Sequence, residues 1–395
     1  MPDRLTEPSP RPTVGPGVGR RLSRRSVVGA AAASLLLTGC VVETPRQGPL
    51  VPTPTAAGIS GQAASVDGPA GRWQGRELRV VAPGDDIREA LRTVLLEPFA
   101  AATGCQLRIG FPAFGDLSTG QSSVDLALVS DRWASQLDAA GALSWLEPIG
   151  REEGLSDLIP ATATAIPAYG NAIVSAYRND AVTVGATPVD WAEWWQSQAL
   201  PGPRTLAKGP YGTFEFSLLA DGVNPASLYP IDLNRAIAGL RRISGSIVDR
   251  WWETGPQVID WLSSGRVAFG SAMAHQVVQA QRAGRPVQPV WNQGLLVADY
   301  WVVPGGATNA DMANDFLRFA LSAAAQARLA SVASLAPVSS AALDLVDPLL
   351  RINLATSPLN LPRLIGSDTQ WWVDNATTAN EAFNSWLLGD PRSRS

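Results

Sequence analysis

The sequence predicts an α/β fold in which an open, mostly parallel sheet carries helices on both faces. From residue 77 onward, short apolar segments of strand length alternate with segments whose apolar residues recur at helical spacing, in the order β-α-β-β-α. The alternation occurs a second time along the 395 residues, and no linker rich in Pro, Gly and Ser separates the two copies. The length therefore allows two domain-sized units.

The first copy of the pattern predicts strands at 77–82, 105–111 and 124–129 and helices at 87–103 and 131–140. The run Val124–Val129 is almost wholly apolar, which is typical of a strand buried on both faces. Asp85 and Asp86 can cap the first helix, and Ser130-Asp131 can cap the second. Ligands of open α/β sheets bind beyond the carboxyl ends of the strands, so these acids, Ser130 and Trp133 are expected near one edge.

The second copy is longer and follows the same rules. It predicts extended segments at 165–179, 266–271, 287–291 and 300–303, and helices at 188–195, 209–222, 233–243, 256–262, 310–332 and 368–387. Asp232 is placed to cap the clearest amphipathic helix, whose apolar positions include Leu233, Ile237 and Leu240.

The first forty residues have the layout of an export signal. The basic stretch Arg20–Arg25 precedes a short apolar segment, Val27–Leu37, and then Leu37-Thr38-Gly39-Cys40. Ser23-Arg24-Arg25 fits the twin-arginine type, although the Sec route stays open. Leu37–Cys40 resembles a bacterial lipobox, in which the sulfur of Cys40 would take a diacylglyceryl group. We therefore expect a signal peptide at 1–39 and a lipidated, flexible tether at 40–76.

Charge and composition exclude several function classes. Cleavage before Cys40 removes six arginines and two acids, which changes the net charge from −4 to −8 and disfavours nucleic acid as a partner. The single histidine, His275, excludes a multi-histidine metal site, and the two cysteines exclude cysteine-rich zinc modules. Cys105 has the pattern of a small buried hydrophobe. We expect no cofactor, no metal and no catalytic residues, because the chain contains no nucleophile elbow, phosphate loop, HExxH or CxxC.

Several segments together resemble an extracellular solute-binding protein of a bacterial ABC importer, with the spermidine/putrescine-binding branch as the most similar. The resemblance is carried by Glu97-Pro98-Phe99 with Thr103-Gly104, Asp125–Ser130, Ala220–Val223 with Leu228–Asp232, Trp291–Gly294 and Asp299–Ala307. No single string is diagnostic, but their order and spacing extend over about 300 residues.

The resemblance implies a two-lobe, type II periplasmic-binding-protein-like fold with open mixed sheets and a ligand cleft between the lobes. One lobe would comprise 77–168 and 299–344, and the other 169–298 and 345–395. The chain would leave the first lobe near Tyr169 and return near Asp299, and hinge motion would close the lobes on the ligand.

The resemblance also implies ligand-binding residues. Asp299 falls where polyamine binders place an amine-binding aspartate, Glu215 falls near their second carboxylate, and Ser130 falls on a ligand-contacting loop. Strand or hinge capping is the alternative role of Asp299, and a solvated helix position that of Glu215. Among 14 tryptophans, Trp133 and the cluster Trp251-Trp252-Glu253 are the further aromatic and acidic candidates, because adjacent aromatics beside an acid rarely all face a core.

Three positions depart from the polyamine-binding pattern. Val297 stands where an aromatic residue is usual, Ala272-Met273 replace an expected Trp, and no acid is present near Gly212. The expected function is capture of a small cationic or polar solute, with a polyamine-like ligand preferred, by a monomer that delivers it to permease and ATPase subunits. The alternatives are a sensory or assembly lipoprotein with the same fold and a secreted carboxylate hydrolase. Ferric iron is a minor alternative ligand that the five scattered tyrosines disfavour.

Overall fold

The structure is a computed structural model. It describes residues 70–82, 84–110, 117–119, 123–146, 149, 155–182, 187–198, 200–244 and 251–389, with the side chains of Asp85 and Asp86 left out. The predicted signal peptide, Cys40 and most of the predicted tether lie outside these residues.

One seven-stranded mixed sheet, ordered β2-β1-β3-β7-β4-β6-β5, runs through the whole described fold. Its strands are β1 (Glu77–Val81), β2 (Gln106–Gly110), β3 (Leu126–Ser130), β4 (Ala165–Arg178), β5 (Arg204–Thr205), β6 (Phe269–Met273) and β7 (Val287–Val302). The pairs β1–β2, β1–β3 and β5–β6 are parallel, whereas β3–β7, β7–β4 and β4–β6 are antiparallel. The two long strands β4 and β7 join what would otherwise be two sheets.

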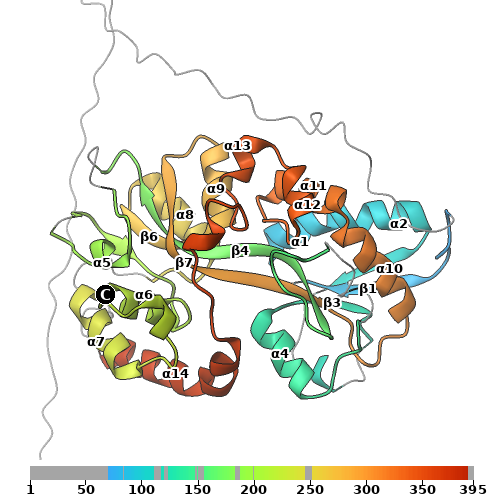
Figure 1. Cartoon of the computed structure of the whole chain (residues 1–395), viewed down its shortest axis with the longest axis horizontal. Helices are drawn as coiled ribbons and strands as arrows, with labels where there is room; N and C mark the ends of the chain where they lie inside the picture. The colour runs from blue at the N-terminus through green and yellow to red at the C-terminus, as the bar shows by residue number, and fades with distance from the viewer. Residues whose placement is uncertain are drawn as a thin grey trace, which may run out of the picture. The chain divides into compact units, whose positions relative to one another are not determined.

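Helices lie on both faces of this sheet (Figure 1). They are α1 (Asp85–Leu91), the π-helical η2 (Arg92–Leu96), α2 (Glu97–Thr103), α4 (Asp131–Ala139), α5 (Trp191–Trp194), α6 (Thr213–Ala220), the 3₁₀ turn η4 (Pro225–Ser227), α7 (Leu233–Ile243), α8 (Gly255–Ser264), α9 (Ala274–Arg282), α10 (Ala310–Leu321), α11 (Ala323–Ala333), α12 (Ser340–Asp344), α13 (Pro348–Arg351), the 3₁₀ turn η6 (Leu361–Arg363) and α14 (Thr369–Gly389). The predicted helix at 87–103 contains the π segment just before Pro98, which has no amide to donate to the carbonyl of Val94.

Two separate cores define two lobes. In the first lobe, Phe99, Trp301 and Phe316 pack with α1, α2, α10 and α11 in one cluster. In the second lobe, Trp191 and Phe383 belong to a cluster that joins α5, α6, α7 and α14. A smaller apolar cluster connects α9, α11 and α12 to β4 and covers the junction of the lobes. The fold is therefore the two-lobe mixed α/β fold that the family resemblance implies. The prediction of a mostly parallel sheet is wrong, because β7 and β4 pair antiparallel with each other and with their outer neighbours.

The pairing of β4 with β7 is interrupted twice. Pro167 pairs with Tyr300 but Tyr169 pairs with Asp299, so Ala168 is an extra residue, and its carbonyl accepts a hydrogen bond from the buried Gln326 (2.9 Å). Further along, Trp291–Gly294 bulge out of β7. The sequence predicts two strands here, because this polar and glycine-containing segment breaks the apolar alternation. The structure shows one continuous strand with a bulge.

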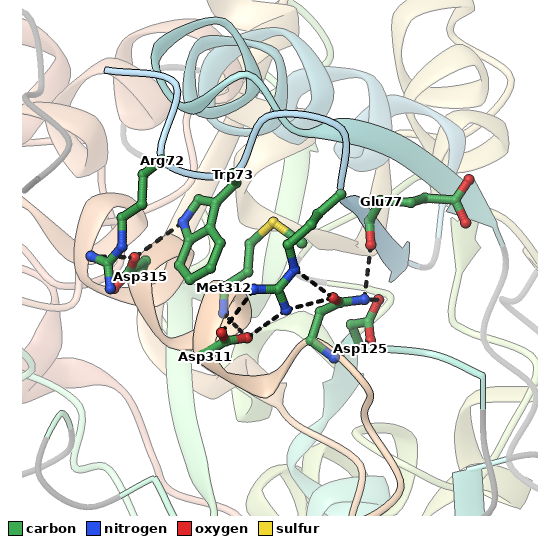
Figure 2. Close-up of polar contacts among 9 residues, drawn as sticks. Arg72, Trp73, Glu77, Asp125, Asp311, Met312 and Asp315 are labelled. Carbon is green, nitrogen blue, oxygen red and sulfur yellow. Dashed lines mark hydrogen bonds and ion pairs between the residues drawn. The ribbon is translucent and has the colours of Figure 1, made fainter. Parts of the chain in front are cut away.

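The turn at residues 70–76 is packed on the first lobe, whereas the sequence predicts a flexible tether up to residue 76. Trp73 is 6% exposed, and its indole N–H donates to Asp315 of α10 (3.1 Å). The guanidinium groups of Arg72 and Arg76 lie over its ring, 4.7 and 4.6 Å from the centroid. Arg72 also pairs with Asp315 (2.8 Å), as Figure 2 shows. The composition of the segment could not predict this packing, because the residues that it contacts lie more than 230 positions away in the sequence.

Candidate functional site

Three strands bring polar side chains to one level at the junction of the lobes. In β7, Asp299 pairs with Ser130 at the end of β3 on one side and with Tyr169 of β4 on the other. The Tyr169 hydroxyl donates a hydrogen bond to Oδ2 of Asp299. The extra residue Ala168 in β4 sets this register, because without it Tyr169 would not lie opposite the aspartate.

Asp299 is held in an environment that disfavours its negative charge. The pKa of Asp299 is raised to about 6, mainly by burial and to a smaller degree by the nearby Asp131, while the Tyr169 hydrogen bond and Arg132 act in the opposite direction. A carboxylate in this setting gains from a positively charged partner, because the partner offsets the cost of desolvating the anion.

The first turn of α4 lies beside this aspartate. Ser130 is the N-cap, and its Oγ accepts a hydrogen bond from the amide of Trp133 (3.3 Å), as the sequence predicts. Asp131 accepts from the amide of Arg132 (2.8 Å) through Oδ1 and from the hydroxyl of Thr369 (3.0 Å) through Oδ2. Because Thr369 begins α14 in the second lobe, its hydrogen bond to Asp131 connects the two lobes.

Arg132 makes a second contact across the junction. Its guanidinium carbon lies 3.7 Å from the ring centroid of Tyr211, a cation–π geometry. Tyr211 in turn packs edge-on against Trp372 (5.2 Å between centroids), and its hydroxyl contacts Ser367 (3.4 Å). Burial raises the pKa of Tyr211, so the phenol stays neutral.

Glu215 lies behind this aromatic pair instead of on a solvated helix face. Its side chain is fully buried in α6, and Oε1 accepts hydrogen bonds from Tyr229 (2.7 Å) and the indole of Trp372 (2.8 Å). Its Oε2 is buried with no hydrogen-bond partner among the described residues. Burial raises the pKa of Glu215 against the opposing hydrogen bond from Tyr229. Glu215 thus fixes the position of Trp372 through a hydrogen bond, and Trp372 packs against the ring of Tyr211.

The cluster Trp251-Trp252-Glu253 does not join these residues. Trp251 packs edge-on against Phe383 and Trp386 in the second core. Trp252 is 9% exposed and donates to Ser271 (3.2 Å), while Glu253 is exposed and paired with Lys208 (2.6 Å). The sequence predicts that this cluster faces a ligand. In the structure each tryptophan instead contacts protein residues that are distant in sequence.

The other candidates are distributed as follows. Trp133 is half-buried and packs on the apolar cluster between β3 and α4. Gly84, and not Asp85 or Asp86, occupies the N-cap of α1, so both acids belong to its first turn, and their side chains are not described. Cys40 lies outside the described residues.

Two features are absent from the described residues. They contain no group of three or more His, Cys, Asp or Glu residues placed to hold a metal ion. Within the same part of the chain, no helix has both the length and the apolar character needed to cross a membrane.

The sequence does not reveal the second lobe's contribution to the junction. Tyr211 and Thr369 carry no local signal, because their contacts reach Arg132 and Asp131, far away in the sequence. Arg132 had a signal: it directly follows the predicted helix cap at the end of a buried strand. Tyr169 was predicted only as the point where the chain changes lobe.

Known proteins are similar to this chain over most of its length. A γ-aminobutyric acid-binding protein of Pseudomonas aeruginosa is 29% identical over 337 residues, which cover 80% of this chain and 92% of that protein. The solved structure of the Atu4243-GABA receptor has a TM-score of 0.72 at 28% identity and covers 79% of this chain and 97% of that chain. The protein AgtB from A. tumefaciens R10, solved with agropinic acid, has a TM-score of 0.67 at 22% identity and covers 80% and 99% of the two chains, and this likeness supports the fold.

The model of the bacterial extracellular solute-binding protein family matches residues 115–350, which is more than half of the sequence. That range contains β3, β4 and β7 and the junction residues of the first lobe, whereas Thr369 of α14 lies beyond it. The chain is therefore a member of the bacterial extracellular solute-binding protein family.

Proposed function

We propose that this protein captures a small organic solute bearing an ammonium group at the junction of its lobes and delivers it to the permease and ATPase of an ABC importer. The observation that carries the proposal is the Asp299 carboxylate, whose pKa is raised to about 6 and which lies beside a second carboxylate, Asp131. No catalytic role is proposed for any residue, since the relatives are described as binding proteins.

An ammonium ion fits this junction for two physical reasons. It would be a positively charged partner for the buried Asp299 carboxylate. In addition, a charge-assisted hydrogen bond in a partly desolvated site is stronger than one in water. The Tyr169 hydroxyl contacts Asp299, and the Tyr300 phenol lies close enough to Asp131 for the charge of that carboxylate to raise its pKa. Aromatic faces would pack against the methylene groups that follow an ammonium group.

The far end of the solute distinguishes two candidates. Arg132 lies beside Asp299 and could pair with a ligand carboxylate, which favours a zwitterion such as an ω-amino acid. The similarity to a γ-aminobutyric acid-binding protein agrees with this candidate. A polyamine would instead use both Asp131 and Asp299, and the departures at Val297 and Ala272-Met273 count against it.

The proposal includes export and anchoring. The family is extracellular, which agrees with the export signal at residues 1–39, and we propose that Cys40 carries the lipid that retains the protein at the membrane. We further propose that the lobes exchange chain near Tyr169 and Asp299, so that β4 and β7 act as the crossing strands of the hinge.

A thermal-shift screen of the purified protein tests the ligand class. The panel contains γ-aminobutyrate, putrescine, spermidine, neutral amino acids, sugars and vitamins, each at millimolar concentration. A ligand present at about 100 times its Kd contributes about 2.7 kcal/mol of stability, so a true ligand raises Tm clearly. Amines alone should shift Tm, and the Asp299→Asn variant should lose the shift. A shift with sugars or vitamins and none with amines would reject the ammonium assignment.

A further inference from the structure

Two adjacent residues of α4 reach from the first lobe to the second. Asp131 accepts a hydrogen bond from Thr369 at the start of α14, and Arg132 stacks on the ring of Tyr211, which precedes α6. Both partners belong to segments packed on the second core, because Tyr211 lies against Trp372 of α14. Both contacts therefore connect lobes that are otherwise joined through the long strands and the cluster behind them.

We infer that these contacts form a latch between the two lobes, and that Thr369 and Tyr211 are positioning residues for solute capture. The latch is defined as the pairs Asp131–Thr369 and Arg132–Tyr211. The inference rests on the proposed capture of a solute at the junction and adds the residues that set how easily the lobes close around it.

Burial and charge support this role for both pairs. Asp131 and Arg132 are half-buried, so their contacts are less screened than those of exposed ion pairs. The Tyr211 ring is fixed from behind by Trp372, whose indole is bonded to the buried Glu215. The second lobe thus presents a rigid ring, and the loss of side-chain freedom on forming the contact falls mainly on Arg132.

The latch has a consequence for affinity. If the binding-competent closed form is only a fraction of the ligand-free protein, the apparent Kd equals the intrinsic Kd divided by that fraction. Loosening the latch lowers the fraction and weakens every ligand by the same factor. Loss of a direct ligand contact would instead weaken ligands by factors that depend on their chemistry.

The first test measures the ligand-free protein and does not depend on the identity of the solute. Spin labels are placed at exposed positions on the two lobes, through Arg108→Cys and Arg241→Cys in a background with Cys40→Ser and Cys105→Ala. Their distance distribution is measured by electron–electron double resonance. Thr369→Val and Tyr211→Leu should each increase the population at longer distance. Tyr211→Phe, which keeps the ring, and Thr378→Val, an exposed threonine of the same helix, should leave the distribution unchanged.

The second test measures affinity by calorimetry with γ-aminobutyrate and putrescine as probes. Loss of one hydrogen bond of ordinary strength changes an equilibrium constant by about three- to tenfold. Thr369→Val should therefore increase the Kd of each probe that binds by one common factor in this range. Unchanged distances in both Thr369→Val and Tyr211→Leu would overturn the latch. If neither probe binds but the distances change, the latch stands and the proposed ligand class fails. Should Tyr211→Leu not fold, Thr369→Val alone decides the result.

Discussion

Asp299 is the residue on which the proposed chemistry depends most. It forms a strand pair with Ser130 and Tyr169, and its pKa of about 6 lies above the ordinary value of about 3.9. Between these two values the folded protein binds more protons than the unfolded chain, so this residue's contribution to ligand-free stability decreases as the pH rises from about 4 to 6. A bound ammonium group reverses the preference, because it favours the ionised carboxylate.

The affinity for an amine should therefore depend on pH. Below pH 6 Asp299 is increasingly protonated in the ligand-free protein and must release this proton when the amine binds. The affinity for the amine should therefore decrease by up to about tenfold for each pH unit below 6. Calorimetry at pH 5, 6 and 7.5 measures this. Asp299→Asn should bind weakly with a flat profile, whereas Asp374→Asn, an exposed position on α14, should behave as the wild type. Equal affinity at pH 5 and 7.5 in the wild type would exclude Asp299 as the ammonium partner.

Glu215 has a structural role that its position in the sequence does not reveal. Its Oε1 accepts hydrogen bonds from Tyr229 and Trp372 in a fully buried site. Glu215→Ala should lower the free energy of unfolding by about 3 kcal/mol, because two buried donors lose their acceptor and a cavity forms. Glu215→Gln keeps one oxygen acceptor and should cost less than about 1.5 kcal/mol. Urea denaturation measures both, and a loss below 1 kcal/mol for the alanine variant would contradict this role.

At the scale of elements, the turn at 70–76 is packed on the first lobe. Trp73 and its two flanking arginines contact α10, and none of these contacts involves the second lobe. These contacts therefore place no restraint on the second lobe.

Truncation of Trp73 should therefore destabilise the protein without changing solute affinity. Burial of this ring predicts a loss of about 3–5 kcal/mol for Trp73→Ala. Trp145 is 69% exposed, and Trp145→Ala should change the stability by less than about 0.5 kcal/mol. Chemical denaturation gives the stabilities and calorimetry the affinities. A change of affinity in Trp73→Ala, measured where the variant is folded, would show that the turn also acts on the junction.

Local signals predicted most elements well, and long-range contacts account for the differences. Asp232 caps α7 at Leu233–Ile243 as the sequence predicts, because capping and amphipathic spacing are properties of a short segment. The continuity of β7 was not predictable, since the bulge at Trp291–Gly294 is held by hydrogen bonds from the Trp191 indole to Gln293 and from the Ile365 amide to Gly294. The same contrast between local signals and long-range contacts applies to the candidate site. The sequence predicts Ser130 and Asp299 as candidates, whereas it gives no indication of Tyr211 or Thr369.

At the scale of the whole molecule, the two long strands β4 and β7 explain how one chain forms two lobes with a polar junction. Each strand contributes pairing to both lobes, and the extra residue at Ala168 lies one position before Tyr169. The strands therefore fix where Asp299 lies, while the contacts from α4 to the second lobe depend on how the lobes are placed.

A crystal structure of the protein with its tightest-binding amine tests the central claim most directly. The account predicts that the ammonium nitrogen lies within hydrogen-bond distance of Asp299, between α4 of the first lobe and Tyr211 of the second. An amine bound elsewhere on the molecule, with Asp299 contacting only Tyr169, would contradict it.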